Sequence, residues 1–336
     1  MTEKILITGA SGFIGSFIVE EALRRGYDTW AAVRRSSSKA FLTDSRIHFI
    51  ELDLSSEATL REQLKGHDFD YVVHAAGVTK CLRKEDFHLI NTEGTQHLVR
   101  ALMAVQKPLR RFVYISSLSI MGAIREQQPY SEIREADQPR PNTAYGRSKL
   151  EAEQWLDALA AEHKDFPYVI LRPTGVYGPR ERDYYMMFKS IQAHTDFAVG
   201  FRRQDITFVY VTDVVQAVFL AIERGVTGRR YFLSDGEVYQ SRTFSDLILQ
   251  ELGNPWCLRI TAPIWLLRLI TLCGEHVGRL TGRVSALNND KFNIMRQRNW
   301  RCDMETARRE LGFEPQVKLA EGVRRTVKWY KENHWL

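Results

Sequence analysis

KILITGASGFIG, residues 4–15, decides the fold of this 336-residue chain. An apolar run leads to Thr8, three glycines follow, and apolar residues then recur at helical spacing as far as Gly26. This order predicts a buried strand, a tight turn and a helix whose first N–H groups have no partner within the helix. Such a turn can bring backbone close to a pyrophosphate. The alternative is an ordinary glycine-rich turn. We predict a dinucleotide site made by Gly9, Ser11, Gly12, Phe13, Ile14 and Gly15.

The rest of the first half alternates short apolar runs with helical periodicity. Strands are predicted at 27–33, 47–52, 71–76, 111–116 and 168–173, with helices over 56–65, 86–105 and 144–162. This alternation predicts an α/β fold with a doubly wound, parallel Rossmann sheet covered on both faces. One more unit, a strand at 206–211, a helix over 213–224 and a strand at 229–234, is expected to return to the sheet. We therefore expect a cofactor-binding domain of residues 1–173 plus about 206–236. Residues 174–205 plus about 237–336 would form a smaller interleaved substrate lobe.

The overall composition narrows the function further. The net charge is +6 and the pI about 9.1, but the cations are scattered among nearly as many acids. No basic stripe typical of a nucleic-acid surface stands out, so the surplus better suits an anionic cofactor or small-molecule substrate. The four cysteines show no CxxC spacing, which favours reduced thiols without a zinc site or disulfides. No apolar signal region precedes the first strand, so we expect a cytoplasmic protein.

The most apolar later stretch, ITAPIWLLRLITLC (260–273), is too short to span a bilayer and contains Pro263 and Arg268. It can line an apolar substrate site or simply fill the core of the smaller lobe. An interfacial helix on a membrane is a third, less favoured interpretation. We predict neither a membrane span nor lipid attachment.

Cofactor choice is indicated at the end of the second strand. Val33 is followed by Arg34, Arg35 and Ser36, where an NAD-binding protein usually carries a carboxylate for the ribose 2′-hydroxyl. A guanidinium can bind a 2′-phosphate in a forked geometry, so Arg34, helped by Arg35, Ser36 or Lys39, favours NADP(H), with NAD(H) as the alternative. The alternative is that Arg34 and Arg35 belong to a solvated surface loop that tolerates basic residues and binds no phosphate.

Two further strand ends complete the predicted cofactor site. Asp53 and Leu54 follow the third strand, and HAAG (74–77) follows the fourth, which adds Ala75, Ala76 and Gly77. Asp53 can bind the adenine amino group or only cap the next helix. His74, at the end of an apolar strand, is interpreted as a packed and hydrogen-bonded side chain.

The chemistry is indicated by Ser117, Tyr145 and Lys149. Tyr145 and Lys149 are four residues apart on a predicted helix, hence on one face. An adjacent ammonium is expected to lower the pKa of the phenol and so favour the phenolate. Lys149 can also bind the nicotinamide ribose, and Ser117 can donate a hydrogen bond to a substrate oxygen. This set predicts hydride transfer coupled to proton transfer by Tyr145.

With these residues the sequence resembles the extended short-chain dehydrogenase/reductases, also called the NAD-dependent epimerase/dehydratase superfamily, over essentially its whole length. The family-like segments, in family order, are TGASGFIG (8–15), HAAG (74–77), NTEGT (91–95), YISS (114–117), YGRSK (145–149), LRPTGVYGP (171–179) and VYVTDVVQA (209–217). The resemblance implies that Ser117, Tyr145 and Lys149 form the catalytic triad and that Arg34 binds the NADP phosphate. It also implies that Pro173 and Val176 pack against the nicotinamide. Asn91 matches a family asparagine, whose role here can be structural only. A homodimer through helices 86–105 and 144–162 is a further implication.

The branch of the family is indicated by three positions. Thr174 stands where sugar-nucleotide epimerases and dehydratases usually carry an asparagine, and Leu118 and Ser119 stand where dehydratases carry acids. The wording of 171–179 and of the C-terminal segment is more similar to dihydroflavonol reductases and 3β-hydroxysteroid dehydrogenases. We therefore expect an NADP(H)-dependent reductase of ketones or aldehydes, or the corresponding alcohol dehydrogenase, acting on a mostly apolar small molecule. A nucleotide-sugar epimerase with retained NAD and a non-catalytic cofactor-sensing regulator are the alternatives.

Overall fold

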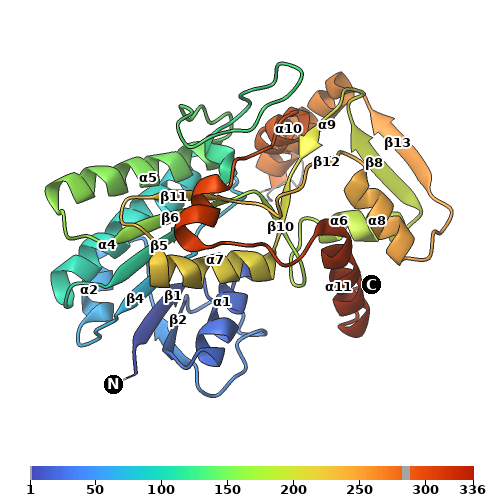
Figure 1. The fold of residues 1–336 in the computed structure, drawn as a ribbon. Helices are drawn as coiled ribbons and strands as arrows, with labels where there is room; N and C mark the ends of the chain where they lie inside the picture. The colour runs from blue at the N-terminus through green and yellow to red at the C-terminus, as the bar shows by residue number, and fades with distance from the viewer. Residues whose placement is uncertain (1, 282–287) are drawn as a thin grey trace.

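The computed structural model describes residues 2–281 and 288–336. Its centre is a seven-stranded parallel sheet in the order β11-β6-β5-β4-β1-β2-β3 (Figure 1). The strands are β1 (Lys4–Thr8), β2 (Asp28–Val33), β3 (His48–Glu51), β4 (Tyr71–His74), β5 (Arg111–Ile115), β6 (Tyr168–Pro173) and β11 (Arg230–Leu233). The strand order reverses between β1 and β4, so the carboxyl ends of these two strands open a crevice there. The predicted doubly wound α/β fold is confirmed.

Helices cover both faces of this sheet. α1 (Phe13–Arg24) and α7 (Val211–Arg224) share one apolar core with it, and α2 (Glu57–Leu64), α4 (Gly94–Val105) and α5 (Ala144–Glu162) share the other. Because both faces are buried, side chains pointing either way from the strands are apolar, which explains the continuous apolar runs in the sequence. The predicted helix over 86–105 is divided into α3 (Glu85–Phe87), a π-helical turn (His88–Glu93) and α4.

α1 shows how closely the local sequence determines the local structure. The helix ends where Gly26 adopts φ +82°, a conformation that side chains disfavour. There the N–H of Gly26 donates to Leu23 O and that of Tyr27 to Ala22 O. The predicted helix end at Gly26 is therefore confirmed.

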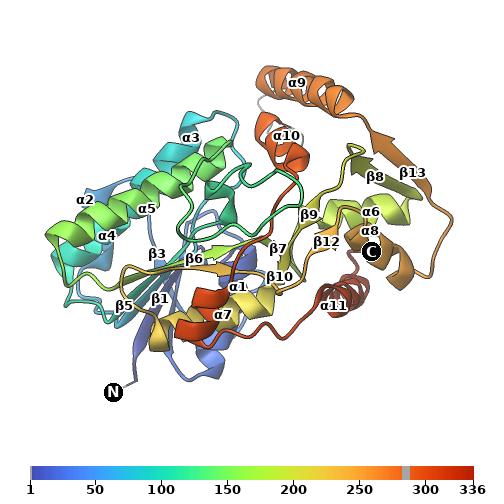
Figure 2. The same ribbon diagram turned by 45° about the horizontal axis from the view of Figure 1, so that its top comes forward.

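A second group of elements lies beside the carboxyl ends of the sheet strands (Figure 2). It contains α6 (Tyr185–Gln192), α8 (Thr243–Glu251), α9 (Ile264–Thr281), α10 (Asn289–Arg296) and α11 (Leu319–Glu332). Its short strand pairs are β7 (Gly175–Tyr177) with β10 (Phe208–Tyr210), β9 (Asp205–Ile206) with β12 (Tyr239–Gln240), and β8 (Thr195–Val199) with β13 (Leu258–Ala262). An aromatic-rich core of its own, including Tyr177, Phe208, Phe244 and Tyr330, holds α6, α8 and α11 together.

The structure corrects two expectations. The predicted strand 206–211 does not enter the main sheet: it is broken at Thr207, whose hydroxyl binds Trp300 O, and its parts pair with β12 and β7. Only β11 of that unit returns, beside β6. The apolar stretch 260–273 does not fill a core either, because α9 buries Leu267 and Thr271 and exposes most of its other apolar side chains.

None of the helices described is both long enough and apolar enough to cross a membrane. All four cysteines are free, and only Cys302 is buried.

Candidate active site

The glycine turn between β1 and α1 has no space for side chains. Gly9 has φ +67°, and a Cβ there would lie 2.7 Å from the backbone of Ala75 and Ala76. A Cβ on Gly15 would lie 2.1 Å from Gly9 O. The turn is thus pressed against the end of β4 and against its own helix, which brings Ala75 and Ala76 to the same place as the glycines.

The first turn of α1 is suited to an anion. Among the residues described, no side chain caps this helix, and its first turn carries no acid. The N–H of Gly12 is taken by Gly9 O at 2.9 Å, so Phe13 and Ile14 present the next N–H groups outward from the turn. Free N–H groups and the positive end of the helix favour a phosphate here, so the residues present fit the pyrophosphate of a dinucleotide.

The ends of β2 and β3 supply the adjoining surface. Arg34 and Arg35 directly follow β2 and are exposed, in a turn closed by Ser37 Oγ, which accepts from Arg34 N at 3.0 Å. Asp53, also exposed, accepts from both the N–H and the hydroxyl of Ser55, which lowers the pKa of its carboxyl. Ser56, not Asp53, caps α2 through Thr59 N. Leu54 is half-buried, and its backbone O binds His97 Nδ1 at 3.0 Å. Asp53 therefore closes a local turn before α2 and does not itself cap that helix, and its contact with adenine stays a prediction.

Ser117, Tyr145 and Lys149 meet at the carboxyl end of β5. Ser117 lies two residues beyond this strand, and Lys149 Nζ donates to Ile115 O at 2.8 Å. Thr143 caps α5 by accepting from Gly146 N, which puts Tyr145 in the first turn and Lys149 one turn later. The Ser117 side chain lies close enough to the Tyr145 phenol to lower the pKa of that phenol. The structure thus brings all three residues together.

The Lys149 ammonium also lies beside the predicted cofactor segment. A Cβ on Gly77 would be 3.3 Å from Lys149 Nζ and 3.0 Å from Asn91 Oδ1. Asn91 is buried; its amide donates to Val78 O and Ser148 Oγ, and its oxygen accepts from Val78 N. Asn91 therefore fastens the segment after β4 to α5, and the glycine at 77 leaves room next to the ammonium.

The expected lowering of the Tyr145 pKa is not present in the protein alone. Burial raises the pKa of Tyr145 to about 12, opposed by the hydrogen bond from Ser117. Burial also lowers the pKa of Lys149 to about 8, while the Glu153 carboxylate raises it. The ammonium is directed to a backbone carbonyl and to the Tyr114 ring, 4.6 Å away, which explains why it does not act on the phenol. This expectation was wrong for the free protein.

His74 is a core residue, as predicted. Its Nδ1 lies 2.7 Å from Thr8 Oγ1 and its Nε2 3.0 Å from Thr95 Oγ1. Burial lowers its pKa to about 3, with a smaller contribution from the Lys149 charge. A neutral imidazole thus ties β1 to β4 and α4 beneath the site.

Pro173 and Val176 occupy the end of β6 and the middle of β7. Between them, the Thr174 hydroxyl lies 2.8 Å from Thr207 Oγ1 and donates to Thr207 O at 3.0 Å. The Thr174 hydroxyl is thus already hydrogen-bonded to Thr207.

A buried ionic cluster beneath the triad was missed from the sequence. Glu153 accepts from the Ser116 hydroxyl, from Arg172 Nε at 3.1 Å and from Arg172 Nη2 at 2.5 Å. Both Glu153 and Arg172 are buried. The cluster therefore joins the residue before Ser117, the helix that carries Lys149 and the residue before Pro173. Its sequence signal is a Glu four residues after Lys149, on the same face of α5.

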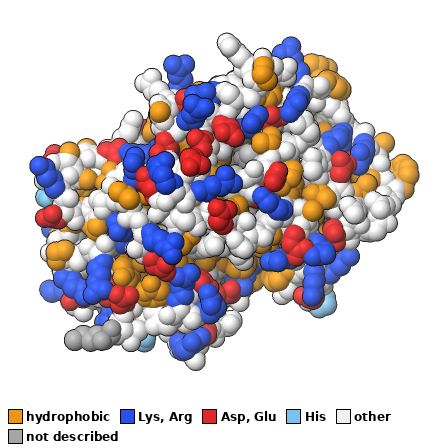
Figure 3. All heavy atoms as spheres, viewed as in Figure 1, with side chains coloured by type: hydrophobic (Ala, Val, Ile, Leu, Met, Phe, Trp, Pro, Cys, Tyr) orange, Lys and Arg blue, Asp and Glu red, His pale blue; other side chains and the backbone are white. Residues whose placement is uncertain are grey.

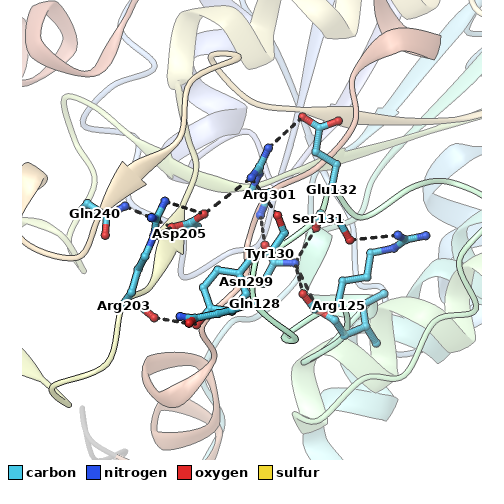
Figure 4. A network of polar contacts seen from close by, with 11 residues as sticks. Arg125, Gln128, Tyr130, Ser131, Glu132, Arg203, Asp205, Gln240, Asn299 and Arg301 are labelled. Carbon is cyan, nitrogen blue, oxygen red and sulfur yellow. Dashed lines mark hydrogen bonds and ion pairs between the residues drawn. The ribbon is translucent and has the colours of Figure 1, made fainter.

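The long loop between Ser117 and Tyr145 is held by residues far away in the sequence (Figure 4). The fully buried Asn299 donates to Arg125 O and Ser131 O, and the buried Asp205 accepts from Arg203 and Gln240. The Tyr130 hydroxyl donates to Arg203 O. These contacts join the loop to the β9–β12 region, and no local sequence pattern predicts them.

α10 contacts the start of α5, the helix that carries Tyr145 and Lys149. Asp290 Oδ2 accepts from Tyr145 N at 3.1 Å, and Asn293 donates to Asn142 O. A carboxylate at the first turn of α5 is favourable for that helix. Asp290 therefore positions Tyr145 from the second group of elements.

The parallel sheet, the glycine turn and the Ser-Tyr-Lys arrangement define a dinucleotide-binding α/β enzyme fold. Comparison with known proteins agrees: the model of the NAD dependent epimerase/dehydratase family matches residues 5–234. The chain belongs to this family, whose members are NAD(P)-dependent enzymes of the extended short-chain dehydrogenase/reductase type.

Individual relatives differ in their reactions. A UDP-glucose 4-epimerase of Vibrio cholerae is 25% identical, over 97% of this chain and 95% of that protein. A ketoreductase of Stigmatella aurantiaca, acting on 4-hydroxy-2-methyl-3-oxo-4-farnesyl-3,4-dihydroquinoline-1-oxide, is 26% identical over 95% and 94%. The solved dTDP-glucose 4,6-dehydratase DesIV of Streptomyces venezuelae, with NAD and TYD bound, has a TM-score of 0.80 and 23% identity, covering 99% of this chain and 98% of that one. The family therefore does not by itself select one reaction.

Proposed function

We propose that this chain is an NADP(H)-dependent oxidoreductase that reduces a ketone or aldehyde of a mostly apolar small molecule, or oxidises the corresponding alcohol. The observation that carries the proposal is that Ser117, Tyr145 and Lys149 come together at the carboxyl edge of the sheet, with Lys149 beside Gly77. A bound nicotinamide dinucleotide would supply or accept the hydride.

The protein's own residues donate the proton to the substrate oxygen and stabilise the negative charge that develops on it. The Ser117 hydroxyl donates to the carbonyl oxygen, and Tyr145 passes its phenolic proton to that oxygen as hydride reaches carbon. With a pKa of about 12, Tyr145 is protonated at neutral pH and is ready to donate. The Lys149 ammonium would bind a ribose hydroxyl of the bound dinucleotide. In alcohol oxidation, the same oxygen of Tyr145 takes the proton back.

The substrate class is inferred from two positions, 174 and 119, at which enzymes of sugar nucleotides usually carry other residue types. Thr174 is bonded to Thr207, and Ser119 lies 3.1 Å from Ser117 Oγ in place of an acid that could drive elimination. The Stigmatella relative is a reductase of a farnesylated ketone, which supports an apolar carbonyl substrate. We propose that residues 174–205 and about 237–336 form the substrate lobe, and that the chain falls in the branch of dihydroflavonol reductases and 3β-hydroxysteroid dehydrogenases.

The deciding experiment is a screen of apolar ketones and aldehydes, monitored by NADPH consumption, with wild type and Tyr145→Phe. We expect turnover by the wild type and a loss of at least about 100-fold in the variant. Dinucleotide affinity should change little. Tyr71→Phe, at the amino end of the sheet, is the matched control and should keep full activity. Normal turnover by Tyr145→Phe would refute the mechanism.

The screen also separates the two alternatives. Purified protein that retains NAD, turns over no added NADPH and interconverts a nucleotide sugar would support an epimerase instead. A protein that binds dinucleotide and turns over neither substrate class would support a cofactor-sensing regulator.

NADP preference is proposed from Arg34 and Arg35, two exposed cations at the end of β2, where a 2′-phosphate would lie. Arg34→Glu should raise the KM for NADPH at least about 10-fold and spare that for NADH. Lys65→Glu reverses an exposed charge elsewhere and should change neither value. Equal use of NADH and NADPH by the wild type would contradict the preference.

A further inference from the structure

The β8–β13 pair has one face that the described part of the protein leaves uncovered. Phe197 pairs with Ile260, and Thr195 with Leu258, in a parallel register. Because side chains alternate along a strand, these four share one face. On the opposite face, Asp196 is buried and binds Arg242 and Ser245 at the start of α8. Phe197 is 59% exposed, so an aromatic side chain stands in solvent where a polar one is usual.

α9 continues this apolar surface. Its buried positions, Leu267 and Thr271, lie one turn apart on one side of the helix. The opposite side carries Trp265, 65% exposed, with Leu269 and Leu272 also exposed. A surface helix ordinarily presents polar residues to solvent, whereas α9 presents large apolar side chains.

The strand pair and the helix form one continuous surface. Gly200, just after β8, donates to Ala262 O at 2.9 Å, and a Cβ on it would be 3.5 Å from the Ile264 side chain. Phe201, 77% exposed, stands at this junction. At the far end, the 76%-exposed Trp256 is held through its backbone O by His194. We define the docking face as Phe197, Phe201, Trp256, Leu258, Trp265 and Leu269.

The docking face is large for a surface that meets only water. Its four aromatic side chains alone expose roughly 500 Å² of apolar area. Figure 3 shows orange hydrophobic side chains at the upper right and right-hand edge, where Figure 1 places α9 and β13, with blue cations nearby.

The charged residues around the docking face indicate which kind of partner it can bind. Arg202, next to Phe201 in the chain, and Arg268, on α9, are exposed. The acids of the same two stretches, 195–203 and 256–276, are Asp196, which is buried, and Glu275, which is half-buried and accepts from Asn289 N. Arg259 is already paired with Asp246. The exposed charge not matched by a neighbouring acid is therefore positive.

We propose that the docking face seats this protein on the surface of an anionic lipid bilayer. Tryptophans are favoured at the bilayer–water interface, apolar helix faces insert just below the headgroups, and exposed cations are attracted to anionic lipids. A second copy of the chain is a poorer partner, because a twofold contact would bring the same cations together. The protein rests on the bilayer without crossing it.

The position of the docking face relative to the candidate active site is informative. α9 packs on α10, and α10 holds Tyr145 N through Asp290. A bilayer on the docking face would thus be separated from the site by two helices, α9 and α10.

The test is flotation of the purified full chain with vesicles of phosphatidylcholine alone or with about a third phosphatidylglycerol, without dinucleotide or substrate. We expect binding to the anionic vesicles that weakens steeply with salt and little binding to neutral ones. Trp265→Ser with Leu269→Ser should reduce binding at least about 10-fold. Val226→Ser, which removes an exposed apolar side chain from the loop after α7, is the control and should bind normally.

Phe201→Ser provides a second test in case the α9 variant is misfolded, because it lies in a loop outside the helix. It should weaken binding several-fold with an unchanged melting temperature. Failure of the wild type to float with anionic vesicles would overturn the proposal. A concentration-dependent dimer that Trp265→Ser dissociates would also overturn it, in favour of a second copy as the partner. Because the assay involves no turnover, its outcome is separate from that of the proposed reaction.

Discussion

Glu153→Gln tests whether the buried cluster beneath the triad acts on both stability and chemistry. The change removes the carboxylate that accepts from Ser116 and pairs with Arg172 in the interior. It keeps the size of the side chain and one oxygen acceptor. Arg172 would remain buried without the carboxylate to which its guanidinium donates.

The magnitude follows from this burial. Breaking a buried ion pair by removing one partner costs about 3–5 kcal/mol, mostly because the remaining charge is uncompensated. The retained amide oxygen places the expected loss for Glu153→Gln near the lower end, about 3 kcal/mol. Glu151→Gln is the matched control. Glu151 lies two residues away on α5 and pairs with His88 at the surface, so its loss should cost less than about 1 kcal/mol.

The assay has two parts. Urea unfolding of the three proteins gives the free energy differences, and a pH profile of kcat/KM reports Lys149. The Glu153 carboxylate raises the pKa of Lys149, so its removal should lower that pKa below about 8. Lys149 works as an ammonium, and the alkaline fall in activity should therefore move to lower pH. Equal stability losses in the two variants, or an alkaline limb that does not move, would refute the argument.

Three further predictions concern the glycine turn and two buried titratable groups. Gly15→Ala should weaken dinucleotide binding at least about 10-fold by calorimetry, because its Cβ would meet Gly9 O; Gly94→Ala, with only an ordinary contact to Leu54, should bind normally. His74 has a folded pKa of about 3, below its ordinary 6.5, so its contribution to stability is present above pH 6.5 and is lost as the pH falls toward 3. His74→Gln should accordingly flatten the acid side of the stability profile measured by urea unfolding; an unchanged slope would contradict this. Lys149 has a folded pKa of about 8 against 10.5, so the cost of burying its charge is complete below pH 8 and vanishes above 10.5. Lys149→Met should therefore abolish turnover yet stabilise the protein by about 2 kcal/mol at pH 7, a gain that shrinks as the pH rises; equal gains at pH 7 and pH 10 would exclude this origin.

Local sequence was sufficient for locating the seven strands of the main sheet, for α1 and for the relation of Tyr145 to Lys149. These features depend on interactions within a few residues: the spacing of apolar side chains, the positive φ of Gly9 and Gly26, and a four-residue separation on one helix. The same short-range regularity made His74 recognisable as a core residue, because it closes an apolar strand.

Tertiary structure alone decided the environment of these residues. The pKa of Tyr145 depends on burial and on where the Lys149 ammonium points, and Lys149 points to a carbonyl that the spacing along α5 does not reveal. Asn299 and Arg203 bind Ser131 and Tyr130, which lie 168 and 73 residues earlier in the chain, and Asp290 contacts Tyr145 from α10. An apolar pattern indicates which side chains of a helix are hydrophobic, but it does not indicate which part of the protein they pack against. Long-range packing therefore decided that Leu267 is buried while Trp265, two residues earlier on the same helix, is exposed.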